Sequence, residues 1–411
     1  MASYVLVGGG VSTVTAAETL RQEAPGASII ILTTEAYPFY YRPMLPYFVA
    51  GVVPEKALFS RRSDLLANQG IEYRMNSHVV DVDLKNKLVK LENGEALPYD
   101  KLLLGTGAKP RPFEVAGAYA SNLASLTEFA DALKLKEQLQ AEELAVVAGE
   151  SLSCIWAINA LIRAGMHVRL LTPGPHLATH ALDARSAALV EAALRRAGVV
   201  ITCDEVQRLM DSDQGLSGVL TKKGEKLDTQ LVFPAVGFQP DTGPARKAGL
   251  EVETGIKVNE HLQTSDPDVF AAGDTIELDA SSGLLPMGRG WLPAYEEGKI
   301  AAQNMLGGQI RYGGKCRRYS VRVFDLDVAI LGDSNSTGPD YEERSELFEE
   351  AGVYKRLNIK KGVLVGAILI GNITEASKLE TAIREGRRLK ELSSSFLRSE
   401  ERRVGKECRS R

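Results

Sequence analysis

The sequence predicts an α/β protein with two Rossmann-like (doubly wound, three-layer) nucleotide-binding domains and a C-terminal α+β interface domain. Three observations predict this fold. A strand, a glycine-rich turn, a helix and a second strand follow one another over residues 3–33. The same plan returns over residues 144–172, which indicates a second domain of the same type. From about residue 313, the apolar runs become typical of antiparallel strands.

The elements of the first part follow from hydrophobic periodicity. Short apolar runs that end in glycine, Thr or charged residues predict strands, and apolar residues at helical spacing predict helices. In order, we expect strand 3–8, helix 11–22, strand 28–33, a helix and β meander within 56–106 closing with strand 101–105, and an inter-domain link at TGAKPRP.

The later elements are predicted by the same patterns. We expect helix 127–141, strand 144–148, helix 152–164, strand 167–172, strands at 230–236, 255–258 and 269–274, helix 293–305, antiparallel strands after 313, and helix 374–392. The predicted domains are 1–112 with 243–312 (the first nucleotide-binding domain), 113–242 (the second) and 313–393 (α+β). We expect residues 394–411, which are polar and basic, to be a disordered tail of non-native origin.

Composition excludes several classes of function. The net charge of −4 argues against nucleic-acid binding. No apolar run reaches the roughly 18 residues of a membrane span. The first residues, MASYVLVGGG, read as a strand and not as a signal peptide.

The distribution of cysteine and histidine predicts neither a disulfide framework nor a metal site. None of the four cysteines forms a C-x-x-C pair, and the five histidines are scattered, with only His176 and His180 four residues apart. A reducing cytoplasm is therefore the expected location. The cysteines are Cys154, Cys203, Cys316 and Cys408.

The first glycine turn is a candidate dinucleotide site, and we call residues 8–13 (GGGVST) the first elbow. Gly8 permits the tight turn, and Gly10 lets a pyrophosphate approach the backbone at Val11 and Ser12, where the helix N-terminus offers N–H groups. Thr13 replaces the usual glycine or alanine and adds bulk. Glu35 follows the second strand, where a carboxylate accepts bonds from ribose hydroxyls.

These motifs, together with several later runs, resemble the FAD-dependent pyridine nucleotide-disulfide oxidoreductase superfamily. The similarity is to its rubredoxin and ferredoxin (NAD(P)H) reductase branch, without a redox disulfide, and covers about residues 3–393. The runs are YPFYYRPMLPYFVAG (38–51), LLLGTGAKPR (102–111), VGFQPD (236–241), TSDPDVFAAGD (264–274) and WLPAYEEGKIAAQNMLGG (291–308).

The resemblance implies a role in FAD binding for several residues. Glu35 would hold the adenosine ribose, Arg42 would lie along the phosphates or sugar, Val80 would meet the adenine through its backbone, Thr106 and Gly107 would form a turn beside the dinucleotide, Gly273 and Asp274 would bind the ribityl chain or pyrophosphate, and the segment at Ala294 would adjoin the flavin ring. Taken alone, Arg42 also reads as a surface ion pair and Asp274 as a helix N-cap.

The second glycine turn departs from the fingerprint, and we call residues 149–154 the second elbow. Gly149 is kept, but Ser151 and Cys154 replace the other two small residues, and the strand ends at Thr172 and not at a carboxylate. Gly237 is a further candidate NAD(P) contact. Two interpretations stay open: NAD(P)H binding has been lost, or the helix has drifted and still binds nicotinamide weakly.

The resemblance implies two more residues near the flavin. The branch commonly has a lysine and a glutamate there, and Tyr47 and Trp156 stand at the corresponding positions of this sequence. No catalytic residue follows from this, and segment 38–51 contains no cysteine, which argues against disulfide, mercury and single-cysteine peroxide chemistry.

Three functions remain open from the sequence. The first is an enzyme that passes electrons from NAD(P)H through FAD to a small redox protein or another acceptor. The second is a FAD electron-transfer subunit with a non-nicotinamide donor, and the third is a non-catalytic FAD-bound assembly component. The C-terminal domain resembles the branch's interface domain, which would close over the flavin or form a homodimer, while its strands read equally well as plain core.

Overall fold

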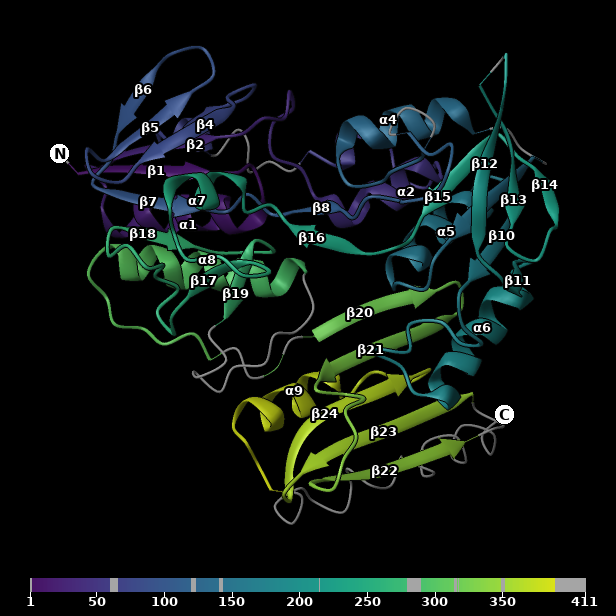
Figure 1. The fold of residues 1–411 in the computed structure, drawn as a ribbon. Helices are drawn as coiled ribbons and strands as arrows, with labels where there is room; N and C mark the ends of the chain where they lie inside the picture. Colours follow the sequence, from purple (N-terminus) through teal and green to yellow (C-terminus); the bar gives the residue numbers. More distant parts are fainter. Residues whose placement is uncertain are drawn as a thin grey trace, which may run out of the picture. The chain divides into compact units, whose positions relative to one another are not determined.

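The structure is a computed structural model that describes residues 2–59, 66–119, 123–139, 143–213, 215–278, 290–313, 316, 318–348 and 352–388 (Figure 1). The described residues form two compact units. The first comprises the chain up to Gly313 together with Arg322–Leu326, and the second comprises Gly314–Val321 and the residues from Asp327 onward. The predicted tail, 394–411, lies outside the described residues.

A parallel sheet in the order β18-β7-β1-β2-β3 is the base of the first unit (Figure 1). Apart from the edge strand β3, its strands are mostly buried, and their consecutive Val, Leu and Ile residues are apolar on both faces, as a parallel sheet between helices requires. A late segment of the chain, β18, pairs with β7 in parallel. The strands are β1 (Ser3–Val7), β2 (Ser28–Leu32), β3 (Glu72–Arg74), β7 (Lys101–Leu104) and β18 (Val269–Ala271), and the helices that pack together beside them are α1 (Val11–Glu23) and α8 (Trp291–Met305).

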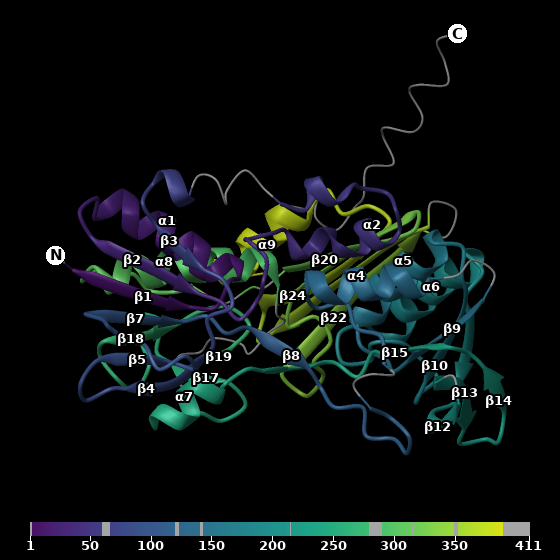
Figure 2. The same ribbon diagram turned by 90° about the horizontal axis from the view of Figure 1, so that it is seen from above.

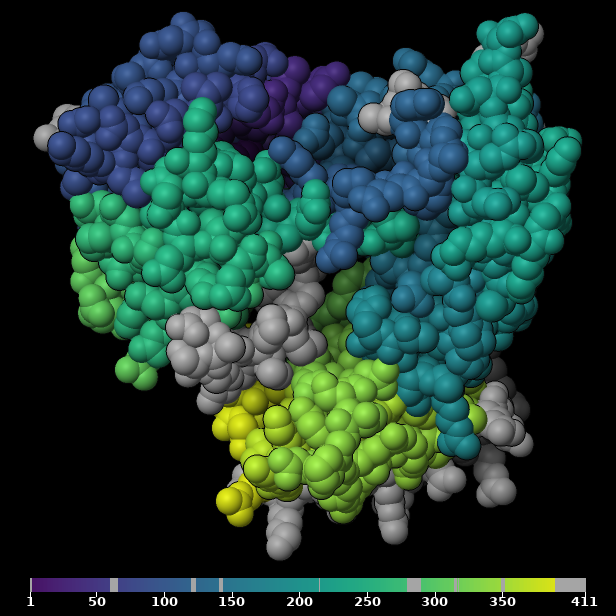
Figure 3. Space-filling view, in the orientation of Figure 1, coloured from purple at the N-terminus to yellow at the C-terminus, as the bar shows by residue number. Residues whose placement is uncertain are grey.

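The antiparallel meander expected within residues 56–106 is present, while the helix expected before it falls partly on residues 60–65, outside the described residues. The meander packs beside a short helix, and Figure 3 shows the two surfaces adjoining. The meander consists of β4 (Val79–Asp83), β5 (Leu88–Leu91) and β6 (Ala96–Pro98), and the helix is α7 (Gly243–Ala248).

A second parallel sheet, in the order β11-β10-β9-β15, repeats the plan of the first. Its elements are β9 (Leu144–Ala148), α5 (Ser153–Arg163), β10 (His167–Thr172), α6 (Ala184–Arg196), β11 (Val200–Cys203) and β15 (Leu231–Pro234), with an antiparallel sheet of β12 (Val206–Ser212), β13 (Gly215–Thr221) and β14 (Lys226–Asp228). The fold class predicted from the repeated plan is confirmed.

The predicted link is a two-stranded antiparallel ribbon of β8 (Ala108–Pro110) and β16 (Phe238–Pro240) (Figure 1), and Figure 2 shows β8 from above. The chain leaves the first sheet through β8 and returns to it through β16. The remaining elements of this unit are the 3-10 helices η1 (Arg42–Met44) and η2 (Glu55–Ala57), α2 (Leu45–Val49), α4 (Phe129–Gln138), β17 (Ile256–Val258) and β19 (Ile276–Leu278).

The second unit is an antiparallel sheet with one helix and a core of its own. The predicted helix 374–392 is shorter in the structure, where it ends at Arg384 and Gly386 follows. The strands, in sheet order, are β20 (Arg318–Val323), β21 (Leu326–Gly332), β24 (Val363–Ile370), β23 (Val353–Lys360) and β22 (Tyr341–Phe348), and the helix is α9 (Ala376–Arg384).

Candidate functional site: a dinucleotide cradle

The first elbow is a tight turn that only glycine allows at its first position. Gly8 has φ +116°, and a Cβ there would lie 2.1 Å from the carbonyl oxygen of Gly105. Gly10 is extended, carries no side-chain cap over α1, and faces open space, with nothing within 4 Å of the place where a Cβ would be. The N-terminus of α1, with Val11 and Ser12, is therefore open to an anion.

Thr13 is accommodated by hydrogen bonds within the first elbow and by one glycine on a facing segment, Gly105. Its hydroxyl donates to Gly8 O at 2.7 Å and to Gly10 O at 2.9 Å, so the side chain links two backbone carbonyls of the first elbow. Its methyl group faces Gly105, where a Cβ would lie only 2.5 Å from Thr13 Cγ2. The bulk that departs from the fingerprint is therefore matched by the absence of a side chain on β7's continuation.

The structure brings the distant Gly273-Asp274 pair to the first elbow. A Cβ on Gly273 would lie 2.9 Å from Ser12 Oγ and 3.9 Å from the Cβ of Ala294 on α8. Asp274 Oδ1 accepts the backbone N–H of Gly290 at 3.1 Å, immediately before α8. Asp274 thus binds the residue that precedes α8. We call residues 8–12, Glu35, Gly273 and Asp274 the dinucleotide cradle.

A buried carboxylate that sequence reasoning missed fixes this convergence. Glu297 is 1% exposed, and its two oxygens accept the N–H of Gly273 at 2.8 Å and the hydroxyl of Tyr312 at 2.8 Å. The motif WLPAYEEGK had drawn attention to this helix, but nothing in the pattern indicated which of its two glutamates points inward.

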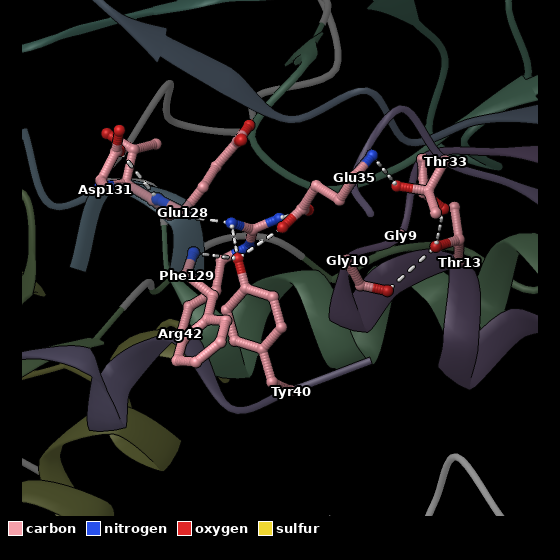
Figure 4. A network of polar contacts seen from close by, with 12 residues as sticks. Gly9, Gly10, Thr13, Thr33, Glu35, Tyr40, Arg42, Glu128, Phe129 and Asp131 are labelled. Carbon is pink, nitrogen blue, oxygen red and sulfur yellow. Dashed lines mark hydrogen bonds and ion pairs between the residues drawn. The ribbon is translucent and has the colours of Figure 1, made fainter. Parts of the chain in front are cut away.

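Glu35 and Arg42 form an ion pair, and Tyr40 joins them (Figure 4). Tyr40 donates its hydroxyl hydrogen to Glu35 Oε2 at 2.5 Å and accepts a bond from Arg42 Nη1 at 2.9 Å. Arg42 therefore forms an ion pair, as expected when it is considered alone. Its partner, however, is the carboxylate that is expected to hold the ribose. Burial raises the pKa of the Tyr40 hydroxyl well above its ordinary value; the charge of Arg42 opposes the rise and that of Glu35 adds to it. Tyr40 therefore keeps its proton and remains a donor.

The other predicted contacts lie around the same sheet. Val80 is at a β-bulge, where it has no ladder partner, and its carbonyl accepts Lys247 Nζ at 2.6 Å. Thr106 Oγ1 lies 3.0 Å from Thr275 Oγ1 and also bonds to Asp241 O, and Gly107 O accepts the N–H of Asp241 at 2.9 Å. Thr106 and Gly107 thus form the turn that leads from β7 into the link.

These residues fit FAD. The open Gly10 and the uncapped start of α1 suit a pyrophosphate. Glu35 follows β2, the strand that pairs with β1, and its carboxylate suits a ribose. Among the described residues, no cluster of three or more His, Cys, Asp or Glu side chains is arranged to hold a metal ion.

The second elbow has the same backbone turn as the first, but its backbone N–H groups are less open to an anion. Gly8 N–H bonds to Leu32 O, and Gly149 N–H bonds to Leu171 O at 2.9 Å. Gly149 has φ +129° and approaches the carbonyl of Ala235 as Gly8 approaches that of Gly105. In contrast, the N–H of Ser151 is bonded to Ala235 O at 3.1 Å, and α5 begins only at Ser153. The N–H that corresponds to that of Gly10, one of the three assigned to the pyrophosphate in the first elbow, is therefore already bonded in the second elbow.

The backbone match also identifies the residue of the second repeat that corresponds to Glu35. Since Leu171 corresponds to Leu32, Thr172 corresponds to Thr33, and the counterpart of Glu35 is Gly174. Thr172 is buried and its hydroxyl donates to Gly174 O at 2.8 Å. Gly237 accepts Arg111 N–H at 3.0 Å in the link. Neither arrangement supplies the acid that an NAD site usually has.

The two residues expected near the flavin lie on neighbouring helices. Tyr47, 41% exposed, is on α2, and Trp156, half-buried, is on α5, and these helices pack together. A second aromatic group, which sequence reasoning missed, stands at the start of α8: the ring of Trp291 lies 4.9 Å from that of Tyr41 and 5.8 Å from that of Phe39.

Two linked dinucleotide-binding sheets, an open first elbow and a separate α+β unit define a flavoprotein of the two-dinucleotide-domain class. Comparison with known families places the chain further. Residues 2–298 match the pyridine nucleotide-disulphide oxidoreductase family and residues 320–387 match the rubredoxin NAD+ reductase C-terminal domain. The chain belongs to the pyridine nucleotide-disulphide oxidoreductase family, whose members bind FAD and use NAD(P)H.

Individual relatives agree with this assignment. The chain is 28% identical over 393 residues to the NAD(P)H nitrite reductase of Bacillus subtilis (strain 168), which is 95% of this chain and 48% of that protein. It is 33% identical over 279 residues to putidaredoxin reductase CamA of Pseudomonas putida, 66% of each. The chain therefore spans between about half and two thirds of the length of these relatives.

A solved structure extends the likeness to the whole fold. The covalent putidaredoxin reductase–putidaredoxin complex contains a chain that matches this one with a TM-score of 0.86 and 25% identity, over 94% of this chain and 93% of that one. Within the part of the chain that the structure describes, no helix combines the length and the apolar character that crossing a bilayer needs.

Proposed function

We propose that this protein is a FAD-dependent oxidoreductase that passes electrons from NAD(P)H through the flavin to a small redox protein or another acceptor. The observation that carries the proposal is the close approach of Gly273, which precedes Asp274, to Ser12 of the first elbow, with Glu35 drawn beside the same elbow in Figure 4. Family membership adds the nicotinamide donor, and the ferredoxin, rubredoxin and putidaredoxin reductases among the relatives add the small carrier protein.

In this proposal, residues 1–112 and 243–312 hold FAD, and 113–242 is the NAD(P)-binding-like domain. The backbone at Gly10, Val11 and Ser12 binds the pyrophosphate, and Glu35 binds the ribose. The remaining FAD contacts are Arg42, Val80, Thr106, Gly107, Asp274 and Ala294. When bound to these residues, FAD would supply hydride acceptance and one-electron release, and the protein would position it.

The spectrum of the purified protein and an anaerobic NADH titration test the proposal. We expect a yellow protein whose flavin band bleaches with NADH or NADPH and recovers when oxidised rubredoxin or a ferredoxin is added. A colourless protein that takes up no FAD would refute it. A flavoprotein that millimolar NADH and NADPH leave oxidised would remove the nicotinamide donor.

A second candidate function is a FAD electron-transfer subunit with a non-nicotinamide donor. The specific observation in its favour is the second elbow, where Ser151 N–H is bonded to Ala235 O and Gly174 replaces an acid. Reduction of the flavin with dithionite, followed by reoxidation with carrier proteins, tests it. Rapid reoxidation without any response to NADH or NADPH supports this function. If no carrier reoxidises the flavin, the remaining function is that of a non-catalytic FAD-bound assembly component. A homodimer and a cytoplasmic location remain predictions.

A further inference from the structure

The carboxylate of Glu35 is held by two hydrogen-bond donors, Tyr40 and Arg42. These two side chains are in turn bonded to backbone groups of residues outside the proposed FAD-binding residues. The side chain of Glu35 is 9% exposed; one oxygen is bonded by Arg42, and the other accepts the Tyr40 hydroxyl at 2.5 Å. A carboxylate has about four lone-pair sites, so two remain for ribose hydroxyls once its orientation is fixed.

The anchors come from residues 125–131, which we call the anchor segment. Tyr40, 4% exposed, accepts the backbone N–H of Phe129 at 2.9 Å. Arg42 Nη1 donates to Thr127 O at 2.8 Å. Figure 4 shows both residues between Glu35 and the start of α4.

The anchor segment is itself fixed by the N-terminus of α4. Asp131 Oδ2 accepts the N–H of Thr127 at 2.9 Å, the N–H of Glu128 at 3.0 Å and the Ser125 hydroxyl at 2.9 Å. The ring of Phe129 is 1% exposed and packs edge-on against Tyr37 at 4.8 Å. The groups that hold Tyr40 and Arg42 therefore have a defined position before any ligand binds.

We propose that Tyr40 is a positioning residue for Glu35, and that the anchor segment completes the adenosine end of the FAD site from the middle part of the chain. This inference rests on the proposed function, because it assigns Glu35 to the ribose of FAD. The chemical class that the arrangement recognises is an adenosine diphosphate with free ribose 2′- and 3′-hydroxyls.

Binding of adenine nucleotides to the apoprotein tests the inference, because ADP carries the ribose hydroxyls and 2′,3′-dideoxy-ADP lacks them. For Tyr40→Phe, we expect about a tenfold rise in Kd for FAD and for ADP, as losing one charged hydrogen bond implies. We expect no change for dideoxy-ADP. In a Glu35→Ala background, Tyr40→Phe should have no further effect on ADP. Tyr99→Phe, which removes another buried tyrosyl hydroxyl, is the control.

A second variant tests the anchor segment without changing Tyr40. Asp131→Ala removes the acceptor that fixes Thr127 and Glu128, and we expect about a threefold loss of ADP affinity, again absent for dideoxy-ADP. Equal losses for both nucleotides, or a loss that persists with Glu35→Ala, would mean a purely structural role and overturn the inference. If wild-type protein binds FAD and neither variant changes ADP binding, the inference alone fails; if wild-type protein binds no FAD, the proposed function fails and the inference with it.

Discussion

Thr13 shows how one residue that departs from a fingerprint is compensated by another far along the chain. Its hydroxyl bonds within the first elbow and its methyl occupies space left by Gly105. The sequence identified the departure, but it gave no sign of the compensation, because Gly105 is 92 positions away and reads as part of a strand end. Only the three-dimensional approach of β1 and β7 relates the two residues.

We predict that Gly105→Ala lowers the free energy of unfolding by about 1–3 kcal/mol, the usual cost of overpacking. The added Cβ would meet Thr13 Cγ2 at 2.5 Å. Adding Thr13→Ser should recover part of the loss, because the methyl is then gone while the hydroxyl that bonds within the first elbow is kept. Gly26→Ala, which faces open space, serves as the control in urea unfolding. A double variant no more stable than Gly105→Ala would contradict this account.

Asp268 offers a pH-dependent test at the same scale. Its oxygens bond to Lys101 Nζ at 2.7 Å and to Lys87 Nζ at 2.5 Å, and these bonds hold the pKa of the carboxyl below its ordinary value of 3.8. A lowered pKa means stabilisation that is complete above the unfolded pKa and lost as pH falls through the folded pKa.

We therefore expect Asp268→Asn to reduce the free energy of unfolding at pH 7 by about 1 kcal/mol, since the pair is partly solvated. The difference from wild type should shrink as pH falls below the ordinary carboxyl pKa of about 4 and disappear once pH lies below the lowered pKa of the folded state. Denaturant titrations at several pH values measure it, with exposed Asp228→Asn as the control. A difference that grows on acidification would reverse the assigned sign.

At the scale of elements, the repeated strand-turn-helix plan was predictable because buried strands and glycine turns have strong local signals. The second sheet, the link and the meander all follow from such signals. What the sequence could not provide were contacts through backbone groups. The N–H of Phe129 and the carbonyl of Thr127 hold Tyr40 and Arg42 across 89 and 85 positions, and a backbone group leaves no mark in the residue pattern.

Register between the two repeats was also beyond the sequence. Strand ends alone suggested Thr172 as the counterpart of the ribose-binding acid. The matching bonds of Gly8 to Leu32 and of Gly149 to Leu171 show that Gly174 is the counterpart of Glu35. This correspondence decides where an acid should be introduced to strengthen NADH binding, namely at Gly174 and not at Thr172.

We predict that Ser151→Gly with Gly174→Glu tightens NADH binding by about tenfold, the value of one charged hydrogen bond. Gly174 has nothing within 4 Å of its Cβ position, so a Cβ is accepted there without a clash. Anaerobic titration of the flavin band or quenching of protein fluorescence measures the change. Gly26→Glu, with the same change of charge at another open glycine, is the control. Equal tightening in the control, or none in the double variant, would argue against a nicotinamide site of the usual geometry.

At the scale of the whole molecule, the chain contains two compact units with separate cores. The elbows and the cradle belong to the first unit, while β21 to β24 and α9 surround the core of the second. A ligand stabilises only the structure that binds it, by an amount set by its concentration relative to Kd. FAD bound at the predicted residues should therefore act unequally on the two units.

We expect calorimetry of the apoprotein to show two unfolding transitions, because each unit buries its own apolar side chains. Adding FAD at about 100 times Kd should stabilise one transition by about 2.7 kcal/mol and leave the other in place. Leu379→Ala, in the buried face of α9, should lower only the transition that FAD does not shift, by about 2–5 kcal/mol. If FAD and Leu379→Ala move the same transition, then the two units unfold together, and the flavin site is coupled to the C-terminal sheet more tightly than their separate cores indicate.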